Sequence, residues 1–338
     1  MRDEKTRLSN VLRIDKNALR LRIKKLLRSN STALFLITVA VIILFYILNN
    51  NFLNRDNIRS ILSSMSFVGV LTVGMTLLLI GGEVDLSCGA VACISAIIAA
   101  LLMNSNVPWV AAVILAILFG AMCGLISAVL VSVLGFMHFI ATLGLMSVYQ
   151  GFVLVITGNV LIPITNEGFA VIGATSIWDL VSLPFIIMLV LMIAYSIILS
   201  STNFGRSIYM CGGNRRAARL CGINPKKVST ILYINSGALA AIAGLLNASR
   251  MRTASPVVGQ TGAVDAITAS VLGGVSFLGG SGGMGSCFIG ILLLNSFNAG
   301  LTVVGFPQYW QIVARGSLLI LALSLDFVFT RSRLHAIA

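Results

Sequence analysis

The stretch SFVGVLTVGMTLLLIGGEVDLSCGAVACISAIIAALLM (residues 66–103) places two long apolar runs on either side of a short polar linker. The linker carries two acids, Glu83 and Asp85, although no Lys or Arg occurs from residue 60 to residue 205. A bilayer core about 30 Å thick needs roughly 20 apolar residues per helix, and each run is close to that length. The stretch therefore predicts two membrane-spanning helices joined by an acidic turn.

The whole chain has the composition of a polytopic membrane protein. Of its 338 residues, 58% are hydrophobic and only 10% are charged, whereas soluble domains carry about a quarter charged residues. The net charge of +13 comes largely from two clusters, because ten of the 23 Lys and Arg lie in the first 28 residues and six more between Arg206 and Lys227. Basic clusters separated by apolar runs are topology signals rather than a groove for phosphates, so nucleic acid is not an expected partner.

Ten windows of the required length can be laid along the chain. The third and the eighth are short and interrupted by glycine, so the sequence supports eight to ten spans in an all-α fold. Together the windows define a membrane domain of residues 31–329. They cover about residues 31–49, 58–80, 86–104, 108–134, 138–157, 182–201, 227–248, 263–278, 284–303 and 308–329.

The basic residues predict which side of the membrane each loop faces. With the N-terminus in the cytoplasm, ten spans place the basic tail of residues 1–30, the loop 202–226 and the C-terminal tail 330–338 inside. The long loop from Gly158 to Val181 has two acids and no base, and it falls outside. The positive-inside rule thus favours an even number of spans with both termini cytoplasmic.

Two Gly-Phe junctions hint at an internal repeat. They lie at residues 135–136 and 305–306, 170 residues apart, and join spans four to five and nine to ten. In the ten-span scheme these junctions fall on opposite sides of the membrane, which would fit two five-span halves of inverted topology. A chance similarity between the two junctions is the alternative.

The basic loop after the sixth span carries the signals of a short helix. In CGGNRRAARLCGINP (residues 211–225) two glycines break the chain, and Asn214 can cap a helix formed by RRAARL. Gly222 can end that helix in a left-handed conformation, after which Asn224 and Pro225 cap and start the next span. A helix bounded in this way would lie across the cytoplasmic face, where a moving partner could use it as a lever. An ordinary basic loop that fixes topology is the alternative.

This loop resembles the coupling-helix motif of permease subunits from bacterial ABC sugar importers, most of all those of the ribose/galactose type. The matches run in order over residues 58–326 and are specific together, although Arg216 stands where an acid often precedes the Ala pair. The other matching segments are GGEVDLSCGAV (81–91), HFIATLGLMSVYQG (138–151), DAITASVLGGVSFLGGSGGMGS (265–286), FPQYWQIVARG (306–316) and LALSLD (321–326).

The resemblance implies a permease in the bacterial cytoplasmic (inner) membrane that moves a ribose- or galactose-like monosaccharide inward. Its implied partners are ATP-binding subunits inside, a sugar-binding protein outside, a second permease copy and membrane lipid. The chain has no GxxxxGK[ST] phosphate loop and no Lys between Lys25 and Lys226, so ATP hydrolysis is expected on a partner and not here. No cofactor and no metal is expected. The residues implied in ATPase coupling are Gly212, Gly213, Asn214, Arg215, Arg216, Ala217, Ala218 and Gly222.

Polar residues within or beside the spans are the candidates for a transport path. A neutral amide in lipid needs a hydrogen-bonding partner, and sugar hydroxyls are one such partner, with helix-to-helix hydrogen bonds as the alternative. Arginines on the outer side could meet an acidic external protein, with interfacial snorkelling as the alternative. The path candidates are Asp85, Thr142, Asn295, Asn298, Gln308 and Trp310. The docking candidates are Arg55, Arg250 and Arg252.

Rival interpretations use the same acids differently. Asp85 with Ser87 can cap the amides at the start of the third span, where the helix dipole favours negative charge, and a gate or path role is the alternative. An ion-coupled secondary transporter would use Asp85, Asp265 and Asp326 as ion sites and would transport without an ATPase. A membrane enzyme would need clustered acids or His at the membrane surface, and the sequence offers none.

Overall fold

The computed structural model describes residues 30–335, and nearly all of its regular structure is helical. The predicted basic tail of residues 1–30 lies outside the described residues apart from Asn30, as do residues 336–338. The long helices are α2 (Asn30–Leu48), α3 (Arg55–Ile80), α4 (Cys88–Asn104), α5 (Trp109–Ala128), α6 (His138–Thr157), α8 (Leu183–Ser201), α11 (Pro225–Met251), α13 (Met284–Val304) and α14 (Gln308–His335).

Shorter elements join these helices. The helical ones are the 3-10 turn η1 (Asn50–Leu53), the π-helical segment η2 (Val129–Val133), α7 (Glu167–Ala174), α9 (Asn203–Gly213), α10 (Arg215–Leu220) and α12 (Gly262–Leu272). Two short antiparallel pairs complete the connections. Strand β1 (Ile162–Pro163) pairs with β4 (Thr253–Ala254), and β2 (Ser176–Ile177) pairs with β3 (Val181–Ser182).

The chain is a polytopic helical membrane protein, as the sequence predicts. Within residues 30–335, six helices are long and apolar enough to cross a bilayer: α3, α5 continued by η2, α6, α8, α11 and α13. Three shorter apolar helices accompany them, at Thr32–Leu48, Cys88–Asn104 and Gly262–Leu272. Two predicted windows differ from the helices. The eighth ends early at Leu272, because Gly273 and the left-handed Gly274 begin a loop, and the last continues to His335.

Helices α3 and α11 form the centre of the bundle. In their most apolar windows 83% of α3 and 67% of α11 is buried, against 22% of α6, so most of the surface of α6 is not covered by the rest of the chain. Two small residues of α5, Gly120 and Gly124, let this helix lie close against α11. A Cβ on Gly124 would stand only 2.2 Å from the carbonyl oxygen of Tyr233. The central pair therefore meets its neighbours through direct backbone contact.

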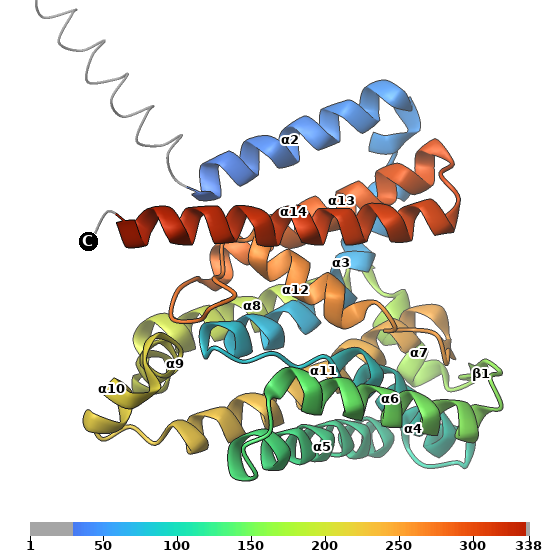
Figure 1. The fold of residues 1–338 in the computed structure, drawn as a ribbon. Helices are drawn as coiled ribbons and strands as arrows, with labels where there is room; N and C mark the ends of the chain where they lie inside the picture. The colour runs from blue at the N-terminus through green and yellow to red at the C-terminus, as the bar shows by residue number, and fades with distance from the viewer. Residues whose placement is uncertain (1–29, 336–338) are drawn as a thin grey trace, which may run out of the picture.

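The bundle has two distinct ends (Figure 1). Helices α9 and α10 lie at one end together with the last turns of α14, and α7 and β1 lie at the other. The predicted inner loop 202–226 and the predicted outer loop 158–181 are thus at opposite ends. Gly135 and Gly305 both adopt left-handed φ values, 81° and 88°, where their helices end. The inverted repeat stays a prediction.

Candidate functional site

Helix α9 covers a segment for which the sequence predicts no helix. Gly212 and Gly213 do not break the chain but form the last turn of α9, and the chain turns at Asn214, which has an extended φ of −158°. Glycine is needed at position 212 for a different reason, which is the close approach of another backbone segment. A Cβ there would stand 1.8 Å from the carbonyl oxygen of Ile80, at the end of α3. Glycine is thus required for close packing between α9 and α3.

Helix α10 has the caps that the sequence predicts. The Asn214 side-chain oxygen accepts hydrogen bonds from the amides of Arg216 and Ala217, at 2.9 and 3.1 Å. After Leu220 the chain reverses at Gly222, whose φ is +81°. Within α10 only Ala218 is buried, and the other five residues are exposed. The helix therefore lies on the surface, with one small side chain facing the bundle.

Four glycines bring three segments together beside α10, and we name this contact the glycine junction (Gly82, Gly212, Gly279 and Gly280). The amide of Gly280 donates to the carbonyl oxygen of Ile80 at 2.8 Å. A Cβ on Gly279 would stand 2.9 Å from the carbonyl oxygen of Gly212 and from the Cα of Gly82. The end of α9, the end of α3 and the loop after α12 are therefore in backbone contact.

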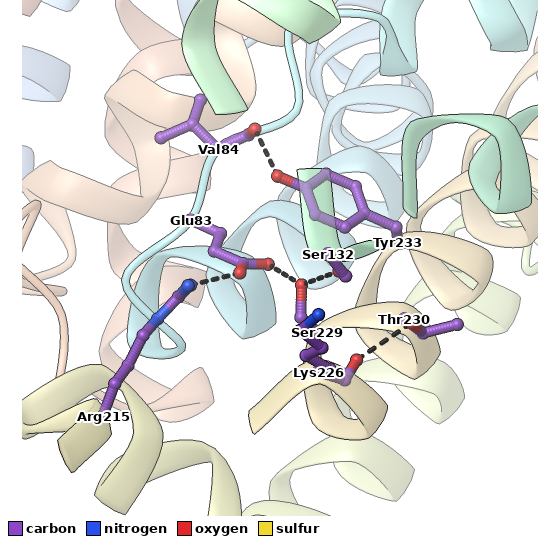
Figure 2. Close-up of polar contacts among 8 residues, drawn as sticks. All are labelled: Glu83, Val84, Ser132, Arg215, Lys226, Ser229, Thr230 and Tyr233. Atoms are coloured by element: carbon purple, nitrogen blue, oxygen red, sulfur yellow. Dashed lines mark hydrogen bonds and ion pairs between the residues drawn. The ribbon is translucent and has the colours of Figure 1, made fainter. Parts of the chain in front are cut away.

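Glu83 is buried beside this junction, with a side chain that is only 1% exposed. No basic residue close in the sequence could pair with it, but Arg215, the first residue of α10, forms an ion pair with its Oε1. The other oxygen, Oε2, accepts a hydrogen bond from the Ser229 hydroxyl at 2.8 Å (Figure 2). Burial raises the pKa of the Glu83 carboxyl above its usual value, while Arg215 and Ser229 act in the opposite direction.

The contacts of Glu83 continue into neighbouring elements (Figure 2). Ser229, in the second turn of α11, shares a hydrogen bond with Ser132 of the π-helical segment η2. Tyr233, one turn further along α11, donates its hydroxyl to the carbonyl oxygen of Val84 at 3.1 Å. The segment of residues 81–87, which we call the linker, is thus fixed to α10, α11 and η2.

Asp85 has hydroxyl and amide partners instead of a cation. Its Oδ1 accepts from the amide and the hydroxyl of Ser87, at 2.9 and 2.5 Å, and its Oδ2 accepts from the Ser236 hydroxyl of α11 at 3.1 Å. The amide that it binds precedes α4, whose first residue is Cys88, and the Ser87 side chain makes no cap bond to the helix. Asp85 therefore stabilises the turn before α4 without capping an amide inside the helix.

A polar cavity of about 310 Å³ opens near the α7 end, between α3, α11, α12, α13 and α14. Its charged centre is Asp265, which is largely buried and lies 3.7 Å from the guanidinium of Arg315. Arg315 also donates to the side-chain oxygens of Asn298 and Thr261, at 3.1 and 3.3 Å. The other polar residues that line the cavity are Asn57, Ser60, Ser64, Asn247, Arg250, Asn295, Thr302 and Gln311.

The cavity contains two of the six predicted path residues, Asn295 and Asn298. Gln308 and Trp310 are exposed near the start of α14 and do not line it, whereas Gln311 does. The remaining two lie elsewhere in the bundle. Thr142 bonds to the carbonyl oxygen of His138 within its own helix, and Asp85 faces α11.

Sequence reasoning missed Arg315 as a cavity residue. A signal for it was present, because Arg315 is the one basic residue within the apolar run of the last span, residues 308–329, and an ionisable residue in a span marks a functional site by default. From the sequence, its partner Asp265 was predicted only as a potential ion site of a secondary transporter. With Arg315 this close to the carboxylate, a cation at that position would have to displace a guanidinium.

Two of the three arginines proposed to dock an external protein, Arg55 and Arg252, have polar partners within the chain, whereas Arg250 lines the cavity. Arg55 donates to the carbonyl oxygen of Trp178 at 2.7 Å, and Arg252 lies 3.4 Å from Glu167. The neighbouring Arg59 pairs with Asp179 at 2.9 Å. These contacts tie the ends of α3 and α11 to the loop 158–181, while Arg252 keeps 54% of its side chain exposed.

Within residues 30–335, no group of three or more His, Cys, Asp or Glu side chains is placed to hold a metal ion. All six cysteines are free, and Cys221, directly after α10, is the exposed one. The Asp326 side chain lies outside the described set.

Comparison with known proteins places this geometry in context. The family model described as "Branched-chain amino acid transport system / permease component" matches residues 57–334. The ribose import permease protein RbsC of Bacillus subtilis is 37% identical over 86% of this chain and 91% of its own length. The probable ABC transporter permease protein YphD of Escherichia coli is 35% identical over 88% and 89%, and the D-allose transport system permease protein AlsC of the same species is 31% identical over 88% and 91%.

No solved structure matches the chain. The family model, however, covers most of the sequence, and the relatives align over most of both chains. The chain therefore belongs to the family of transport-system permease components that this model describes.

Proposed function

We propose that this chain is the transmembrane permease subunit of an ABC importer that moves a small sugar across the cytoplasmic membrane. The observation that carries the proposal is the alignment, over most of both chains, with permeases named for ribose import and D-allose transport. The chain's own apolar helices supply the membrane pathway. ATP hydrolysis then takes place on separate ATP-binding subunits.

The α9–α10 end is the proposed docking face for those subunits. Helix α10 is capped at its start by Asn214, and the chain changes direction after it at Gly222. Its buried Ala218 packs against the bundle, so α10 is a defined element that a partner can push. Backbone contact at Gly212 connects this face to α3. The coupling residues proposed from the sequence, Gly212 to Ala218 and Gly222, all belong to this face.

The polar cavity at the α7 end is the proposed entry site for the sugar. Carboxylate, guanidinium and amide groups are suited to sugar hydroxyls, because each hydroxyl both donates and accepts hydrogen bonds. Asp265 supplies acceptors, Arg315 supplies donors, and Asn298 supplies both. In the ten-span scheme this end faces outward, which is where a binding protein would deliver its sugar.

The finer architecture is proposed on the same basis. Both described chain ends lie with α9 and α10 (Figure 1), which fits cytoplasmic termini and ten spans arranged as two inverted halves. A second copy of the permease would complete the pathway. On the outer face Arg55, Arg250 and Arg252 would attract acidic groups of the sugar-binding protein, since complementary charge steers encounter.

Reconstitution tests the proposal. The permease, its ATP-binding subunits and the sugar-binding protein are placed in proteoliposomes, and uptake of radiolabelled ribose and allose is measured with and without ATP. We expect uptake only when all three components and ATP are present. Uptake by the permease alone, driven by a proton or sodium gradient, would instead identify an ion-coupled secondary transporter and reject the proposal.

A further inference from the structure

We infer that Glu83 and Arg215 form the mechanical link through which a displacement of α10 is passed to the linker of residues 81–87. The inference rests on the proposed function, because it requires that the ATP-binding subunits move α10. It assigns a positioning role to a carboxylate on the linker, far from the docking surface in the sequence. Glu83 and Arg215 are 132 positions apart.

The pair connects a surface element to the interior of the bundle. Arg215 is the first residue of α10 and keeps 48% of its side chain exposed, whereas Glu83 is 1% exposed. Among the described residues, Arg215 is the one arginine of α10 with an ion-pair partner; Arg219 is exposed and has none. A partner that pushes α10 therefore acts on the buried carboxylate through Arg215.

The second carboxylate oxygen extends the link into the bundle. It accepts from Ser229 of α11, and Ser229 is bonded to Ser132 in η2 (Figure 2). A π-helical segment is a local departure from the regular helix that is frequent at functional sites. A shift of Glu83 would therefore disturb its hydrogen bond to Ser229 of α11 and, through Ser229, the hydrogen bond to Ser132 of η2.

The linker passes the same shift towards α4. Val84 accepts from Tyr233, and Asp85 binds both Ser236 of α11 and Ser87, which directly precedes α4. Backbone contact at the glycine junction keeps the end of α3 in register with α9. One segment of seven residues, held by hydrogen bonds along its length, thus connects α10 with α3, α4 and α11.

Stability is not a sufficient reason for this pair. The cost of taking a carboxylate out of water can exceed what the attraction of a half-exposed arginine returns, and neutral replacements of buried ion pairs are often tolerated. A pair kept at such a cost is better explained by a role in coupling. That role predicts that loss of the charge at Glu83 impairs transport more than it impairs folding.

The test uses the reconstituted complex described above. The variants are Glu83→Gln, Arg215→Gln and the exchange of both charges, Glu83→Arg with Arg215→Glu. Arg219→Gln is the matched control, because it removes the same charge from the same short helix at an exposed position. Four quantities are measured: co-purification with the ATP-binding subunits, thermal unfolding of the permease, basal ATP hydrolysis, and uptake with its accompanying stimulated ATP hydrolysis.

We expect Glu83→Gln to co-purify with the ATP-binding subunits and to unfold at a temperature close to that of the wild type. Its sugar uptake per ATP hydrolysed should fall about tenfold, within the range that coupling between two sites typically takes. Arg215→Gln should lose uptake similarly. Arg219→Gln should lose much less, because it removes a charge from the docking face without touching Glu83, and the exchange of both charges should restore part of the uptake.

Three results would overturn the inference. The first is unchanged uptake in Glu83→Gln, and the second is a loss of folding and complex assembly in parallel with uptake, which indicates a structural role only. The third is an equal loss in Arg215→Gln and Arg219→Gln, a comparison that decides the matter even if the charge exchange prevents folding. A wild-type complex without ATP-dependent uptake would reject the proposed function itself, and the inference with it.

Discussion

A methyl group added at Gly212 tests whether α9 must lie directly against the end of α3. The Cβ of Gly212→Ala would stand 1.8 Å from the carbonyl oxygen of Ile80 and 2.7 Å from the amide nitrogen of Gly280. Ordinary contacts begin at 3.4 Å, so the two backbones must separate by about 1.6 Å, and neither is a flexible side chain that could turn aside. The same movement would break the 2.8 Å hydrogen bond between Gly280 and Ile80.

The expected cost combines both effects. Overpacking of a tight contact costs about 1–3 kcal/mol and a lost backbone hydrogen bond about 1 kcal/mol, so Gly212→Ala should lower the free energy of unfolding by about 2–4 kcal/mol. The neighbouring Gly213→Ala is the matched control, because a Cβ there has no heavy atom within 4 Å. It should be neutral or slightly stabilising, since Ala favours a helix over Gly by about 1 kcal/mol.

Thermal unfolding of the purified permease in detergent measures this difference, and co-purification with the ATP-binding subunits reports whether the docking face survives. A lower unfolding temperature for the alanine at position 212, with little change for the alanine at position 213, supports the reasoning. Similar behaviour of the two variants would refute it, because an added Cβ meets backbone atoms at position 212 and meets nothing within 4 Å at position 213.

Four further predictions address other parts of the molecule. Asn214→Ala removes the acceptor for two amides at the start of α10, which should cost about 1 kcal/mol and reduce co-purification of the ATP-binding subunits; full recovery of those subunits would contradict this. Arg315→Gln leaves the buried carboxylate of Asp265 without its cation, so the concentration of sugar-loaded binding protein that gives half-maximal uptake should rise about tenfold; an unchanged value would argue against the cavity as the entry site. Because burial raises the pKa of Glu83 above 4.5, folding favours its protonated form, and the wild type should gain stability relative to Glu83→Gln as the pH falls from neutral towards 4.5. Unfolding curves that stay parallel over this range would disprove the shift. Arg252→Glu should weaken attachment of the sugar-binding protein, most strongly at low salt, and equal affinity at every ionic strength would remove Arg252 from the docking face.

The helical layout was predictable because its signals are local. Length and apolarity identified the long apolar helices, and single residues marked the ends of α10: Asn214 binds two amides at its start, and Gly222 reverses the chain after it. Asn224 likewise accepts from the amide of Lys227 at the start of α11. Each of these contacts lies within a few residues of its cause, so a sequence window contains all the necessary information.

The tertiary contacts were not predictable in the same way. The partner of Glu83 comes from position 215, and the reason for glycine at position 212 is the carbonyl oxygen of Ile80. Arg315 and Asp265 meet across two helices that only the packed bundle brings together. Apolar periodicity says that a helix is present but does not say which neighbour it faces. The sequence therefore indicated which residue types were candidates for the site, but it did not indicate which of them would pair with one another in the folded bundle.

The exposed Cys221 gives this chain a natural reporter. It stands at the end of α10, and the other five cysteines are buried. A thiol-reactive fluorophore or spin label should therefore attach at this one position in the native sequence, with no need for a cysteine-free background. Such a label would follow the motion of α10 during ATP turnover, in the same wild-type complex whose transport is measured.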